Sequence, residues 1–97
     1  MKKMMVKNQN SFEKHLHLNR YFNGQLAVFV LGHMREPLAE LSIMNDSVEL
    51  APNEFILKDY SENKDLANEF FEAELINTTD RFILVGSHLC PICQIES

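Results

Sequence analysis

The chain has 97 residues, of which 45% are hydrophobic, and this composition supports one folded domain over residues 1–97 and argues against global disorder. No hydrophobic run reaches the roughly 18 residues needed to cross a bilayer, and no signal-peptide core follows the basic start, so we expect a cytoplasmic protein. Residues 1–20 contain five basic residues and one acidic residue, whereas residues 21–97 contain four basic and thirteen acidic residues. Direct nucleic-acid binding by the folded body is therefore disfavoured, because cations are needed to replace phosphate counterions.

The N-terminal part of the chain is predicted to lead into a first β-strand. Residues 1–11 show no clear periodicity and are interpreted as frayed or helical, so residues 1–13 are expected to be a lead-in to the domain. Beyond them the pattern alternates with a period of two, which places Leu16 and Leu18 on one face and His15 and His17 on the other. This alternation is typical of a strand with one face against the core.

The dipeptide Asn23-Gly24 predicts a tight hairpin after this strand. A two-residue type I′ turn needs positive φ at both central positions, and Asn-Gly meets that requirement. Such a turn would place Arg20 opposite Ala27 across the hairpin. The run 26–31 is hydrophobic at every position, so we expect a central strand that is covered on both faces.

A third strand is predicted over residues 38–44, after a connection marked by Gly and Pro at residues 32–37. Its alternation places Leu41 on the inward face and Ser42 on the outward face. Together the three strands form an antiparallel meander in the N-terminal half of the chain.

One helix is predicted, and it begins at Asn63, a favourable N-cap residue. Leu66 and Phe70 belong to an apolar stripe with helical spacing. A longer helix would bring Glu74 into this stripe, so we expect the helix to end near Ala73.

The remaining strands are predicted at 54–58, at 81–85 after a turn at 77–80, and at 88–95. Pro91 lacks a backbone donor, so the last strand is expected at a sheet edge or with a bulge. The predicted fold class is α+β: an antiparallel sheet of about five or six strands with one helix packed on a face.

Two runs of sequence, YFNGQLAV at 21–28 and EPLAELSI at 36–43, resemble a family of small bacterial proteins of unknown function. Members of that family are carried on plasmids, conjugative elements and phages. The resemblance spans about residues 15–95 and includes the segment 52–55, the Asn-capped helix 63–71 and the Cys-containing strand 89–95. It implies a mobile-element setting, in which small acidic proteins are often inhibitors of host defence.

The C-terminal run His88-x-Cys90-x-x-Cys93 is the stretch closest to a chemical motif. Cysteine and histidine side chains are zinc ligands, and a Cys-x-x-Cys pair can also be redox-active. A fourth zinc ligand would have to come from one of the other histidines, His15, His17 or His33. Zinc sites usually show two paired clusters and redox pairs usually precede a helix, so two reduced thiols in a strand are the simpler interpretation.

Acidic residues dominate the middle of the chain, with twelve carboxylates and two lysines between Glu36 and Asp80. Such a run serves solubility in many small domains, but it also fits a partner with a basic groove. On and just before the predicted helix, an exposed acidic face would consist of Glu62, Asp65, Glu69 and Glu72.

These features predict a non-enzymatic interaction protein of a mobile element. Its expected role is anti-CRISPR-like: inhibition of a host defence nuclease by occlusion of a basic nucleic-acid-binding groove. No nucleophile elbow and no phosphate-binding loop is found, so we expect no enzymatic activity and no cofactor. No membrane partner is expected either, because no hydrophobic run is long enough to span a bilayer. The alternative is a small zinc- or thiol-dependent protein that uses His88, Cys90 and Cys93. A homodimer joined through an exposed edge near Ile92 would be compatible with either role.

Overall fold

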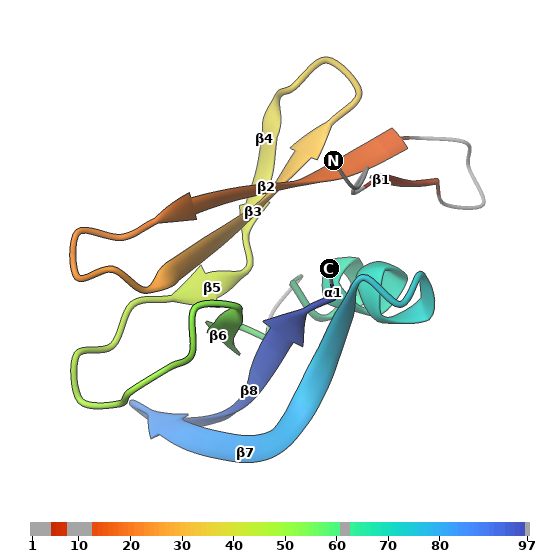
Figure 1. Ribbon diagram of the computed structural model, residues 1–97. Helices are drawn as coiled ribbons and strands as arrows, with labels where there is room; N and C mark the ends of the chain where they lie inside the picture. Colours follow the sequence, from red (N-terminus) through yellow and green to blue (C-terminus); the bar gives the residue numbers. More distant parts are fainter. Residues whose placement is uncertain (1–4, 8–12, 61–62, 97) are drawn as a thin grey trace.

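A computed structural model describes residues 5–7, 13–60 and 63–96, which form two antiparallel sheets of four strands each and one helix (Figure 1). The first sheet has the order β1-β2-β3-β4, with strands Met5–Lys7, Glu13–Arg20, Leu26–Gly32 and Pro37–Glu40. The second sheet has the order β5-β6-β8-β7, with strands Ser42–Ile43, Glu54–Leu57, His88–Ile95 and Ile76–Val85. The helix α1 spans Asn63–Glu72.

The predicted α+β class, antiparallel pairing and N-terminal meander are confirmed, but the strands form two sheets instead of one. The division falls inside the strand predicted at 38–44, because β4 pairs in the first sheet and β5 in the second. The lead-in at 1–13 also differs from the prediction. It contributes β1 to the first sheet and the start of β2, and its other residues lie outside the described part of the chain.

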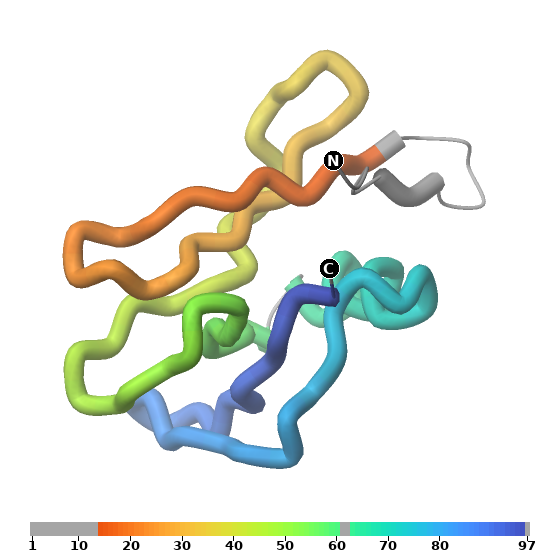
Figure 2. The backbone as a smooth tube through the Cα atoms, in the orientation of Figure 1, coloured from red at the N-terminus to blue at the C-terminus, as the bar shows by residue number. Residues whose placement is uncertain are grey.

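The chain passes directly from the first sheet to the second after β4 (Figure 2), and the backbone of Leu41 is hydrogen-bonded to both sheets. Its amide donates to the Val28 carbonyl of β3 at 2.8 Å, and its carbonyl accepts from the Lys58 amide at 2.7 Å. In an antiparallel hydrogen-bonded pair both bonds are exchanged, so the Val28 amide would ordinarily donate to Leu41. Because the Leu41 carbonyl is directed to the second sheet, the Ser42 hydroxyl oxygen accepts the Val28 amide instead, at 2.8 Å.

Ser42 is therefore buried, with 2% of its surface exposed, and its predicted outward position is wrong. The alternation that predicted this position assumes one continuous strand on one sheet. Here the chain leaves one sheet for the other at Leu41, so the alternation of the first sheet does not continue to Ser42. The polar side chain is buried because it replaces a missing backbone acceptor.

The hairpin at Asn23-Gly24 is confirmed, but its loop is one residue longer than predicted. Arg20 pairs with Leu26 and not with Ala27. Gly24 has a φ of 91°, whereas Asn23 is not among the described residues with positive φ. One left-handed residue is typical of a type I turn closed by a Gly bulge, which shifts the register of β2 against β3 by one residue.

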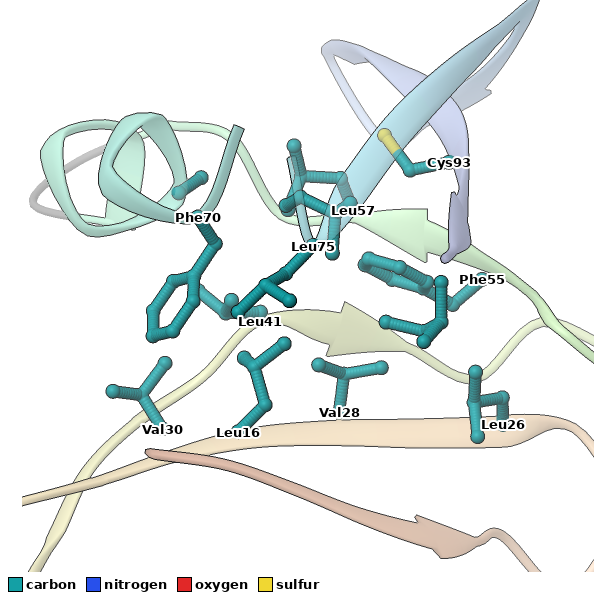
Figure 3. Packing of buried hydrophobic residues seen from close by; sticks show 13 residues of the cluster. Leu16, Leu26, Val28, Val30, Leu41, Phe55, Leu57, Phe70, Leu75 and Cys93 are labelled. Atoms are coloured by element: carbon teal, nitrogen blue, oxygen red, sulfur yellow. The ribbon is translucent and has the colours of Figure 1, made fainter. Parts of the chain in front are cut away.

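The main hydrophobic core lies between the first sheet on one side and the second sheet with α1 on the other (Figure 3). Its largest fully buried members are Leu41, Phe55, Leu57, Phe70, Ile76, Val28 and Val30. β3 is central as predicted, but its outer face is less covered, since Phe29 and Leu31 are only half-buried. A smaller cluster on the other face of the second sheet contains Ile56, Cys90 and Ile92, and the β5–β6 loop and Tyr60 pack against it.

Helix α1 begins at Asn63 as predicted and ends within one residue of the predicted position. The Asn63 side-chain amide donates to the Glu40 carbonyl at 2.9 Å, which ties the start of the helix to the end of β4. At the other end, Glu74 adopts a left-handed φ of 61°, and the Leu75 amide donates back to the Phe70 carbonyl at 3.0 Å. This is the Schellman arrangement, with a glutamate where glycine is usual and Leu75 buried as the closing hydrophobic contact.

The turn predicted at 77–80 is a bulge within β7. The register against β8 shifts between Thr78 and Arg81, and the strand continues to Val85. The Thr79 hydroxyl donates to the Ile92 carbonyl at 2.8 Å, so the bulged residues remain attached to β8. Turn-forming residues here bend the strand without ending it.

Of the two alternatives predicted from Pro91, the sheet edge is wrong, because β8 lies between β6 and β7, and the bulge is found in β7 between Thr78 and Arg81 and not at Pro91. For the same reason β8 has, within the described chain, no exposed edge near Ile92 where a dimer contact was expected. Pro91 pairs with Phe82 of β7, whereas the pairing with β6 begins only at Ile92. The proline therefore stands at the point where the β6 ladder ends, and no ladder bond is lost there.

Candidate functional site

The predicted acidic face is only partly assembled. Glu62 lies outside the described residues, and Asp65 and Glu72 are exposed on α1. Glu69 is half-buried, and both of its carboxylate oxygens accept from the Lys14 ammonium group of β2 at 2.9 Å. The prediction that Glu69 faces solvent as a free carboxylate is therefore wrong, because Lys14 from the first sheet reaches over it.

The C-terminal end of α1 carries negative charge that the helix itself disfavours. Glu72 occupies the last turn, which contains no basic residue, and exposed Glu74 follows it. The C-terminal end of a helix dipole is negative, so carboxylates at this end raise the free energy of the fold. Glu74 additionally adopts a left-handed φ, which favours glycine. We call Asp65, Glu72 and Glu74 the α1 acidic surface.

Other charges are either paired or scattered over the described surface. The Glu54 carboxylate accepts from the Ala51 amide at 2.9 Å and lies 2.6 Å from the Arg81 guanidinium. The Ala51 amide, which has the larger effect, and the Arg81 guanidinium together hold the pKa of Glu54 below its usual range. Within 13–60 and 63–96 the other exposed carboxylates are Glu36, Glu40, Asp46, Glu49 and Asp80, and the exposed basic residues are Arg20, Arg35, Lys64 and Arg81.

Cys90 and Cys93 do not form a pair of ligands, because they project from opposite faces of β8. Residues three apart on a strand point to opposite sides, and accordingly Cys93 belongs to the main core and Cys90 to the smaller cluster. Burial, assisted by the Asp59 carboxylate, raises the pKa of Cys93 to about 12 and also raises that of Cys90. A raised pKa disfavours the thiolate that both metal binding and thiol chemistry require.

His88 does not join the two cysteines in a metal or thiol site either. Its ring is exposed and stacks on Tyr60, with centroids 3.8 Å apart and planes inclined by 6°. In the described part of the chain no three His, Cys, Asp or Glu side chains form a group that could hold a metal ion. The geometry thus gives the zinc- or thiol-dependent alternative no support.

A polar network of half-buried Tyr21, exposed Glu40 and buried Ser42 joins the two sheets beside the Leu41 crossing. The Tyr21 hydroxyl donates to the Glu40 carboxylate and lies 2.8 Å from the Ser42 hydroxyl. Burial, followed by the bond to Glu40, raises the pKa of Tyr21 to about 12. A surface hollow of about 390 Å³ adjoins the network, lined in part by Lys58 and Tyr60. The Ser42 oxygen is engaged by the Val28 amide, so its position is explained by the fold.

The β7–β8 hairpin exposes apolar side chains that the sequence did not single out. Phe82, Leu84 and Leu89 are 57%, 64% and 63% exposed. Phe82 pairs with Pro91 and Leu84 with Leu89, so these side chains share one face of the hairpin. The sequence contained one relevant signal, since residues 82–85 are all hydrophobic and so place apolar side chains on both faces of the strand.

No protein-family model, curated protein or solved structure matches this chain. Within the described residues no helix is long and apolar enough to cross a membrane. Function is therefore inferred from the chain's own surface, on which the α1 acidic surface and the apolar face of the β7–β8 hairpin are the two distinctive regions.

Proposed function

We propose that the chain is a non-enzymatic interaction protein that binds a basic surface of a protein partner through the α1 acidic surface. The observation that carries this proposal is the placement of Glu72 and Glu74 at the negative end of the helix dipole. Both residues lower the stability of the helix end, and residues that break local stability rules concentrate at functional sites. Asp65 lies seven residues before Glu72 and so projects from the same side of α1.

The partner's chemistry follows from the charge of this surface. Exposed carboxylates attract arginine and lysine side chains, and the same side chains line grooves that bind nucleic-acid phosphates. The specific form we propose is occlusion of such a groove in a host defence nuclease, in line with the mobile-element resemblance of the sequence. Binding would be electrostatically steered and would weaken as salt screens the charges.

A pull-down from host lysate at low and high salt tests this proposal. We expect a captured partner to be retained at about 0.05 M salt and released at about 0.5 M, because the Debye length falls below the width of the surface. Glu72→Lys should weaken binding by at least about tenfold, a loss typical of reversing one charge in an electrostatic contact.

Glu49→Lys is the matched control, because Glu49 is also exposed and lies in the β5–β6 loop, on the other side of the molecule from α1 in Figure 1. The control should bind within about threefold of wild type, as expected for a surface change outside the contact. Salt-independent binding, or equal losses in the two variants, would refute the proposed contact.

A further inference from the structure

The outer strand of the second sheet, β7, offers an open edge. In the described chain β7 pairs only with β8, and Figure 1 shows it along the outer side of the sheet with no other element beyond it. An open edge presents unpaired backbone donors and acceptors and is a template for another strand. The bulge between Thr78 and Arg81 interrupts this edge, so the regular part is confined to residues 81–85.

The residues whose backbone groups point outward can be identified from the hairpin geometry. Val85 pairs with His88 around the turn at Gly86, where φ is 61°. The closing pair of a two-residue hairpin is hydrogen-bonded, and bonded and non-bonded pairs then alternate along the ladder. The Ile83 amide is therefore directed to Cys90, whereas the amides and carbonyls of Phe82 and Leu84 point away from β8.

We propose that a second copy of this chain docks antiparallel on β7, with a two-fold axis at Ile83. In this register Phe82 of each copy lies opposite Leu84 of the other, and both are the residues with outward backbone groups. Four backbone hydrogen bonds form, and the two second sheets become one continuous sheet. A two-fold axis makes the contact self-complementary, as closed dimers require.

Two observations favour a second copy as the occupant of this edge. In this register Phe82 and Leu84 of one copy lie beside Leu84 and Phe82 of the other on the same face of the joined sheet, and with Leu89 on each β8 they form one apolar strip across the dimer. In addition, residues 82–89 contain no Asp, Glu, Lys or Arg, so the net charge of −5 on each chain does not oppose contact at the edge itself.

The size of the patch sets the expected strength. The three side chains together expose on the order of 300 Å², the size of a functional patch on a monomer. Even with the strand backbone added, the contact is smaller than the roughly 800 Å² per partner of a standard stable complex. We therefore expect a weak, reversible dimer with a dissociation constant in the micromolar range.

Sedimentation equilibrium of the purified chain from about 5 to 500 µM tests the dimer across the concentration range where weak interfaces form. The average mass should rise from that of a monomer towards that of a dimer as concentration increases. Leu84→Lys should raise the dissociation constant at least about tenfold, because lysine on an edge strand blocks pairing. Met34→Lys is the matched control: Met34 is 81% exposed in the β3–β4 loop, and its replacement should leave dimerisation unchanged.

Hydrogen exchange of the wild-type chain gives an independent test that needs no variant. The amides of Phe82 and Leu84 should become protected as concentration rises, whereas the Ile83 amide should be protected at every concentration by its bond to β8. A monomer at every concentration, a dimer unaffected by Leu84→Lys, or exchange at Phe82 and Leu84 that does not depend on concentration would each overturn the proposal. The partner of the α1 acidic surface is absent from both experiments, so their outcome is independent of that proposed function.

Discussion

Removal of the Ser42 hydroxyl is the most informative single change to this fold. In Ser42→Ala the Val28 amide loses its acceptor at 2.8 Å, and the Tyr21 hydroxyl loses a neighbour at the same distance. Val28 is fully buried and Ser42 is only 2% exposed, so the amide loses its acceptor in a part of the fold with little access to water. An unsatisfied buried donor costs about 1–3 kcal/mol, and a lost hydrogen bond adds about 1 kcal/mol.

We therefore expect Ser42→Ala to lower the free energy of unfolding by about 2–4 kcal/mol. For a domain of this size each kcal/mol lowers Tm by about 4–8 °C, so the loss is measurable by thermal melting as well as by urea titration. Ser87→Ala is the control, since Ser87 is exposed in the β7–β8 turn, and it should change stability by less than about 0.5 kcal/mol. A loss below about 1 kcal/mol in Ser42→Ala would show that Ser42 does not replace a backbone acceptor at the crossing.

A helix-end substitution, an ion pair and alkaline pH give three further expected outcomes. Glu74→Gly should raise the free energy of unfolding by about 1 kcal/mol in urea titrations, because glycine adopts the left-handed φ of 61° without strain; an unchanged midpoint would contradict this. Lys14→Met should lower Tm more at low salt than at 1 M salt, since it removes the partner of Glu69, and an equal loss in both buffers would refute an electrostatic contribution. The pKa values of Tyr21 and Cys93, both raised to about 12, favour the neutral groups in the fold, so the contribution of these two groups to stability should be constant below about pH 9 and fall from pH 9 to 12. Cys93→Val should remove the part of this fall that begins near pH 9, and an unaltered pH profile in urea titrations would count against that assignment.

Local signals in the sequence were sufficient to predict the helix and the hairpins. Three signals predicted the helix: the apolar stripe with Leu66 and Phe70, the preference of asparagine for a helix start at Asn63, and the charge that Glu74 would bring into the stripe of a longer helix. Each of them acts within a few residues, and the helix forms within one residue of the predicted bounds. Asn23-Gly24 likewise predicted the hairpin, but the loop has three residues and not two, and the resulting register pairs Leu16 with Val30, which both face the main core.

Long-range features could not be predicted in the same way. The division of the strand at Leu41 depends on where two separate sheets pack, and nothing in its own alternation indicates a change of sheet. The bond between Lys14 and Glu69 joins residues 55 positions apart, so helical periodicity alone placed Glu69 in solvent. The opposite orientation of Cys90 and Cys93 could have been predicted from the sequence. Both lie in a predicted strand, and residues three positions apart in a strand point to opposite faces.

The central position of β8 has a consequence for folding during synthesis. Every other strand of the second sheet precedes β8 in the chain, yet β6 and β7 are joined only through it. A nascent chain on the ribosome can complete the first sheet early, since its strands are sequential neighbours. The second sheet stays incomplete, with hydrophobic side chains exposed to water, until β8 has left the exit tunnel and can insert between β6 and β7.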